Sequence, residues 1–99
     1  MTPEVAARLA SLGIGLMAEA KAYSIFARDQ CLALVQRNDS GFSSLGSSGM
    51  MTESGLTYLV WRDGRAWLVG KQGETEADAG QVEQIRQFSG DLKAALGLE

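Results

Sequence analysis

Hydrophobic positions near the start of the chain recur at helical spacing. Thr2 is a suitable N-cap residue, and Pro3 fits the first helical position because a missing N–H costs nothing there. Gly13 and Gly15 each weaken the middle of such a helix by up to ~1 kcal/mol. We therefore predict a helix that starts at Pro3 and bends or restarts at these glycines. Its apolar face is formed by Val5, Leu9, Leu12, Leu16 and Ala20.

The segment that follows fits two interpretations. Apolar residues from Tyr23 to Val35 keep helical spacing, so the helix could continue. Alternatively, the helix ends near residue 27 or 28 and residues 31–37 form a strand. We favour the strand, because Asn38-Asp39-Ser40-Gly41 is a strong turn cluster. Residues 42–49 are rich in Ser and Gly, and they predict an edge strand or a mobile loop.

Residues 56–71 carry the clearest pattern in the chain. Asp63-Gly64 lies between two β-prone runs, which is typical of a hairpin with a type I′ turn. A two-residue turn fixes the register, so that Val60 faces Trp67 and Tyr58 faces Val69. Both faces of the hairpin are then apolar: one carries Tyr58, Val60, Trp67 and Val69, and the other carries Leu59, Trp61, Ala66 and Leu68.

The last segment predicts a second helix. Thr75-Glu76-Ala77-Asp78 has the spacing of a capping box, with Asp in place of Glu or Gln, and Gly97 suits the C-terminal stop. The apolar stripe between them consists of Val82, Ile85, Phe88, Leu92, Ala95 and Leu96.

These elements predict one α+β domain over residues 1–99. We expect two layers, with an antiparallel sheet of about four strands and the N- and C-terminal helices packed on one face. Two helices cover only one face of the sheet, so an apolar face is left for a partner, most simply a second copy of the chain. The predicted interface consists of Tyr58, Val60, Trp61, Trp67 and Val69.

Composition narrows the chemistry by elimination. The chain has no histidine and one cysteine, which excludes the usual Cys/His zinc sites, an intrachain disulfide and Ser-His-Asp or Cys-His catalysis. We predict no catalytic residue, no cofactor and no metal. The net charge of −3 and the short apolar runs predict neither a nucleic-acid nor a membrane partner. Cys31 lies in an apolar run and is interpreted as a small buried hydrophobe, so a cytoplasmic location fits best.

Two other places have candidate binding chemistry. Residues 41–55 form the only candidate site loop, in which Ser47, Ser48, Met50 and Met51 are potential ligand contacts, although a flexible connection explains the composition equally simply. Arg62 and Arg65 flank the hairpin tip and are potential anion contacts, although solvated side chains are the simpler interpretation.

The run Ala33-Leu34-Val35-Gln36-Arg37-Asn38-Asp39-Ser40-Gly41, followed by Ser47-Ser48-Gly49, resembles the first hairpin of Roadblock/LC7 domains. The resemblance lies in the order of elements, and where the family has a central helix only residues 49–55 remain. It implies dimerisation through the sheet and a role as a scaffold or regulator of small GTPases. We therefore expect a non-enzymatic interaction module that self-associates. The alternative is a small-ligand-binding domain that uses residues 41–55 and a tryptophan.

Overall fold

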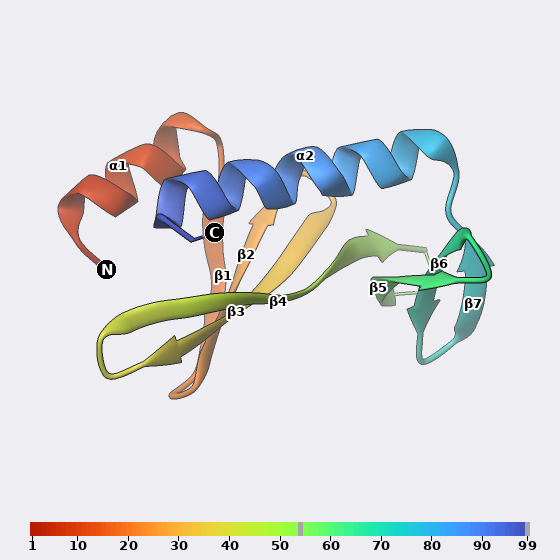
Figure 1. The fold of residues 1–99 in the computed structure, drawn as a ribbon, viewed down its shortest axis with the longest axis horizontal. Helices are drawn as coiled ribbons and strands as arrows, with labels where there is room; N and C mark the ends of the chain where they lie inside the picture. The colour runs from red at the N-terminus through yellow and green to blue at the C-terminus, as the bar shows by residue number, and fades with distance from the viewer. Residues whose placement is uncertain (54, 99) are drawn as a thin grey trace.

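The computed structural model describes residues 1–53 and 55–98 of the chain. A layer of two helices lies on one face of a single antiparallel sheet (Figure 1). The elements are α1 (Pro3–Ser11), β1 (Gly15–Glu19), β2 (Tyr23–Arg28), β3 (Cys31–Asn38), β4 (Gly41–Thr52), β5 (Gly55–Arg62), β6 (Arg65–Gly70), β7 (Gly73–Glu76) and α2 (Ala79–Leu96).

The sheet has seven strands, which overturns the prediction of about four. The fold is α+β, as expected, and the strands follow one another across the sheet in chain order from β1 to β7. Each strand therefore pairs with its neighbours in the sequence. β1, β2 and β7 are the strands that the hydrophobic pattern did not predict as strands.

α1 is shorter than its apolar spacing predicts. The Thr2 hydroxyl accepts a hydrogen bond from the Val5 N–H and caps the helix, which ends at Ser11. Gly13 then adopts a positive φ of 72°, which turns the chain out of the helix. Leu16 and Ala20, predicted on the same helical face, instead lie in and just after β1, the first edge strand.

The strand predicted over residues 31–37 is confirmed as β3, but the helix predicted to run up to it is wrong. Residues 23–28 form β2, which pairs with β3 through a two-residue turn at Asp29-Gln30. Asp29 has a φ of 55°, a conformation that Asp tolerates better than most residues. The apolar residues between Tyr23 and Val35 that keep helical spacing thus belong to two paired strands.

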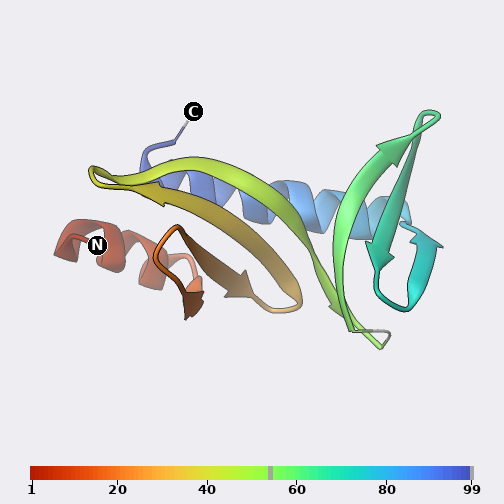
Figure 2. The same cartoon turned by 90° about the horizontal axis from the view of Figure 1, so that it is seen from below.

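Residues 41–52 form β4, which lies in the middle of the sheet and is neither an edge strand nor a loop. The register with β3 shifts between Ala33 and Val35, where Gly46 and Ser47 together lie opposite Leu34. Such a bulge bends the strand. Gly49 lies so close to β5 that an added Cβ would overlap the Thr57 carbonyl oxygen. In Figure 2, β4 crosses the molecule between one group of strands, β1–β3, and the other, β5–β7.

The hairpin at Asp63-Gly64 is confirmed, and β5 and β6 have the predicted register. Both turn residues have positive φ, 54° at Asp63 and 75° at Gly64, as a type I′ turn requires. Val60 pairs with Trp67 and Tyr58 pairs with Val69. The sequence therefore determined which side chains share a face in this part of the sheet.

The N-cap of the C-terminal helix is Asp78, three residues after the predicted N-cap Thr75. Residues 73–76 form β7, and the capping box is made by Asp78 and Gln81, whose side chains each accept from the other's backbone N–H. Gly97 ends α2 with a φ of 72°, as predicted. α2 then runs along the sheet and meets α1 near the C-terminus (Figure 1).

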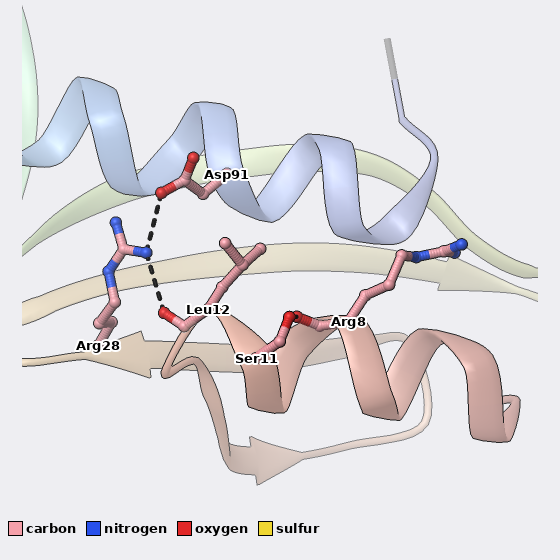
Figure 3. Close-up of polar contacts among 5 residues, drawn as sticks. All are labelled: Arg8, Ser11, Leu12, Arg28 and Asp91. Carbon is pink, nitrogen blue, oxygen red and sulfur yellow. Dashed lines mark hydrogen bonds and ion pairs between the residues drawn. The ribbon is translucent and has the colours of Figure 1, made fainter.

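The core lies between the helices and the sheet. Phe26, Val35, Phe88 and Leu92 are fully buried there. Arg28 joins the sheet to both helices: its Nη1 donates to the carbonyl of Leu12, the C-cap of α1, at 3.1 Å and to Asp91 Oδ2 of α2 at 2.9 Å (Figure 3). The same guanidinium lies 5.6 Å from the centre of the Phe88 ring. Arg28 thus fixes α1, β2 and α2 relative to one another.

Candidate functional site

The two faces of the sheet have different surroundings. The face that α1 and α2 cover is called here the inner face, and the opposite one the outer face, which Figure 2 shows in front of the helices. Cross-strand partners share a face and alternate residues change face, so the register assigns each side chain. The apolar residues of the outer face include Ile25, Leu32, Leu34, Met51, Leu56, Tyr58, Val60, Trp67 and Val69.

The middle of the outer face is hollowed and apolar. A hollow of about 140 Å³ is lined by Ile25, Leu32 and Leu34 together with Leu56 and Tyr58 of β5. A larger, adjoining hollow of about 630 Å³ shares Leu56 and Tyr58 and extends along β6. Leu56 is 55% exposed and Tyr58 47%. Large apolar side chains grouped in this way are uncommon on the surface of a monomer and are typical of an interaction site.

The hairpin end of the outer face carries paired charges. Arg62 donates from Nη1 and Nη2 to the two carboxylate oxygens of Glu74, each at 2.9 Å. Arg65 Nε lies 4.0 Å from Glu76 Oε2. The hydrogen bond from Arg62 lowers the pKa of the Glu74 carboxyl from its ordinary value. The arginines predicted as anion contacts therefore face carboxylates of β7, the strand that the sequence pattern presented as a helix start.

The predicted interface residues divide between the two faces. Tyr58, Val60, Trp67 and Val69 lie on the outer face, and Trp61 lies on the inner face, near the end of the hairpin. Trp61 is nevertheless 57% exposed. Trp61 and Trp67 lie at neighbouring pairs of the β5–β6 hairpin and therefore lie on opposite faces of the sheet. Ile25 was missed because β2 was not predicted as a strand. Leu32 and Leu34 lie in the predicted strand, but the sequence did not show that this strand places them beside the β5 residues of the hollow.

The predicted ligand contacts in residues 41–55 also divide, because this segment is a strand. Met50 is buried in the core, whereas Met51 lies on the outer face and is 41% exposed. Ser48 lies on the inner face, where its Oγ accepts a hydrogen bond of 2.9 Å from the Ser89 Oγ of α2.

A second cleft opens beside this hydrogen bond. It has a volume of about 330 Å³ and lies between α2 and the strands β4 and β5. Its walls combine Ser47, Ser48 and Trp61 with Arg86 and Ser89 of α2. Arg86 and Ser89 were missed, because an arginine and a serine on an amphipathic helix normally indicate only its solvated face.

Cys31 is buried, as predicted, with 1% of its surface exposed. Burial raises the pKa of the Cys31 thiol; Arg28 opposes this shift and Asp29 adds to it. Residues 1–53 and 55–98 contain no cluster of three or more His, Cys, Asp or Glu side chains placed to hold a metal ion. Across the same residues, neither helix is long and apolar enough to cross a membrane.

Comparison of the chain with protein-family models, with curated proteins and with solved structures finds no match.

Proposed function

We propose that the protein is a non-enzymatic interaction module that self-associates through the outer face of its sheet. The observation that carries the proposal is the apolar hollow bordered by Leu56 and Tyr58 on a face that no helix covers. The occupant we propose is a second copy of the chain. The absence of histidine from the sequence supports a role without acid–base catalysis by imidazole.

The size of the molecule leaves room for a dimer contact on the outer face. The molecule extends 38 × 25 × 24 Å, and its longest axis is horizontal in Figure 2, where the outer face of the sheet is turned to the viewer. A footprint of this size is comparable to the ~800 Å² per partner that a standard interface buries. The face therefore has room for a stable two-fold contact.

The distribution of side chains also suits a dimer. Exposed apolar residues occupy the middle of the outer face, and the Arg62–Glu74 and Arg65–Glu76 pairs lie at its hairpin end. An apolar centre with a charged rim is the usual anatomy of a protein interface. Because each arginine already has a carboxylate beside it, two copies can approach without bringing unpaired like charges together.

Substitutions at two exposed positions test the proposal. Leu56 and Tyr58 point to solvent in one molecule, so replacing each with glutamate should leave the monomer folded. We expect the wild-type chain to elute as a dimer in light scattering at tens of micromolar, and Leu56→Glu/Tyr58→Glu to elute as a monomer.

Trp61→Glu is the matched control, since Trp61 is as exposed as Leu56 but lies on the inner face. It should leave the dimer intact. A monomeric wild-type chain, or dimers that dissociate equally with Trp61→Glu, would contradict the proposal. A dimer that survives the double substitution but dissociates with Met17→Pro would place the contact at the β1 edge instead, because Met17 is 54% exposed there.

The resemblance to Roadblock/LC7 domains extends the proposal to a dimeric regulator of a small GTPase in the cytoplasm. Its support is the pair of terminal helices and the uncovered sheet face. The family's central helix has no counterpart in the described residues, where α1 and α2 are the only helices. Binding of purified small GTPases to the wild-type dimer but not to Leu56→Glu/Tyr58→Glu would support this extension. If both proteins bound the GTPase equally well, GTPase binding would not depend on self-association.

A further inference from the structure

The cleft between α2 and strands β4 and β5 combines three kinds of chemistry in one small volume. Leu59, Val82 and Ile85 contribute apolar surface, Trp61 contributes an aromatic ring, and Arg86 contributes a positive charge. Hydroxyl groups come from β4 and α2. A cavity of about 330 Å³ lies at the lower end of the size range of small-molecule sites.

We propose that this cleft binds a small aromatic carboxylate. A planar ring fits against the indole of Trp61 and the apolar wall, and the carboxylate is the natural partner of the Arg86 guanidinium, which can donate two parallel hydrogen bonds. The site lies on the inner face and is independent of self-association through the outer face.

Arg86 is accessible to such a ligand. Its side chain is 67% exposed, and its nearest carboxylate is Glu83 Oε2 at 4.0 Å, one turn away on α2. A contact of this length on an exposed helix surface is weak. A ligand carboxylate can therefore replace Glu83 beside Arg86 at little cost, and Glu83 acts as a competitor for the same guanidinium.

The Ser48–Ser89 pair supplies a donor. Two hydroxyl groups carry two protons, and the hydrogen bond between Ser89 Oγ and Ser48 Oγ uses one of them. The other proton can be donated to an acceptor in the cleft. The hydrogen bond also holds α2 against β4, which fixes the two walls of the cleft relative to each other.

The exposed indole of Trp61 favours binding of an aromatic ligand in the cleft. Trp61 remains 57% exposed although it lies on the face that the helices cover, and it lines the cleft together with Val82 and Ile85 of α2. Burial of this ring by a ligand recovers hydrophobic free energy that the folded chain alone leaves unused.

Ligand-observed ¹⁹F NMR with the full chain tests the proposal, with 4-fluorobenzoate as the probe and neutral 4-fluorobenzamide as its control. We expect 4-fluorobenzoate to bind with a Kd on the order of 1 mM, as suits a fragment of this size. 4-Fluorobenzamide should bind at least about tenfold more weakly, because it lacks the charge that Arg86 recognises. Inorganic phosphate should compete only weakly, since it has no ring.

Arg65→Gln is a matched control for Arg86→Gln. Both arginines are 67% exposed, and both have a glutamate at 4.0 Å, but Arg65 lies on the outer face. Arg86→Gln should weaken 4-fluorobenzoate binding about tenfold, and Arg65→Gln should change it by less than about twofold. Glu83→Gln should strengthen binding, because it removes the competing carboxylate.

The proposal is overturned if 4-fluorobenzoate does not bind, if benzoate and benzamide bind equally, or if Arg86→Gln behaves like Arg65→Gln. Phosphate binding as tight as that of the benzoate would also overturn it, because the aromatic wall would then contribute nothing. The same titration with Leu56→Glu/Tyr58→Glu should give an unchanged Kd, so failure of the dimer and failure of this site can be distinguished.

Discussion

Gly49 is a residue at which β4 and β5 lie too close together to admit a side chain. A Cβ at this position would overlap the Thr57 carbonyl oxygen and lie 2.5 Å from Tyr58 Cα, both of them backbone atoms that cannot rotate away. The pairing of Gly49 with Tyr58 places this contact beside the outer hollow. The close approach of β4 and β5 at Gly49 therefore depends on the absence of a side chain.

Gly49→Ala should lower the free energy of unfolding by about 1–3 kcal/mol, because strands β4 and β5 must separate to admit the methyl group. Urea denaturation measures the loss. Gly90→Ala is the control: Gly90 lies in α2 with open space around its Cα, so alanine should stabilise the helix by about 0.5–1 kcal/mol. Equal stability of the two variants would show that Gly49 is not under steric constraint.

Glu74 is a residue whose ionisation reports on the outer face. Its pKa in the folded chain lies below the ordinary 4.5 because Arg62 donates to it. A lowered folded pKa means that this interaction contributes fully above pH 4.5 and is lost as the pH falls through the folded value. In Arg62→Gln, the Glu74 pKa should return towards 4.5, as measured by ¹³C NMR titration of the carboxyl group. An unchanged pKa would show that the pair does not persist in solution.

At the scale of elements, the helix layer is held by two arginines that contact the C-terminal halves of both helices. Arg28 of β2 binds the last carbonyl of the α1 segment and Asp91 of α2, and its side chain is only 21% exposed. A second arginine, Arg8, donates from Nε to the Ala95 carbonyl at 2.9 Å. Both arginines link α1 to α2, so the two helices form one layer although most of the sequence separates them.

Asp91→Ala should lower the free energy of unfolding by about 1–3 kcal/mol, since a largely buried guanidinium loses its charged partner. Chemical denaturation measures the change. Glu83→Ala removes a carboxylate from the same helix, but its partner Arg86 is exposed, so the effect should stay within about 0.5 kcal/mol. Similar losses in both variants would mean that the Arg28 contacts add no specific stability.

The elements differ in how far the sequence determines them. The Asp63-Gly64 turn was predictable with its register because its backbone needs two residues with positive φ, and these two residues are adjacent in the chain. The first helix was predicted too long because Leu16 and Ala20 continue its spacing by coincidence. β2 instead forms a strand by pairing with β3, and β1 by pairing with β2, and the spacing of apolar residues in these segments does not display this pairing.

The candidate sites likewise depend partly on local sequence and partly on contacts between distant segments. Tyr58, Val60, Trp67 and Val69 were predictable as one face from the hairpin alone. The outer hollow also needs β2 and β3, and the inner cleft needs Arg86 and Ser89 of α2 beside Ser48. Contacts between segments some forty residues apart come from packing, which the spacing of residues within each segment does not encode.

At the scale of the whole molecule, stability and self-association are linked. If the outer faces of two copies are in contact in the folded state only, mass action raises the melting temperature with protein concentration. We expect this rise for the wild-type chain over a hundredfold concentration range, measured by circular dichroism. Leu56→Glu/Tyr58→Glu should melt at the same temperature throughout the range. A concentration-independent wild-type melting temperature would contradict dimer formation.

The strict order of the strands has a consequence for synthesis on the ribosome. Each strand pairs with the strand before it in the chain, which has already emerged. Each strand can therefore pair as soon as it emerges itself, and the sheet is able to assemble during translation. α2 emerges after β7, and until it docks, Phe26, Val35 and Leu68 of the nascent chain lack the helix that covers them in the folded core. The interval between the release of β7 and the docking of α2 is therefore when the chain is most in need of a chaperone.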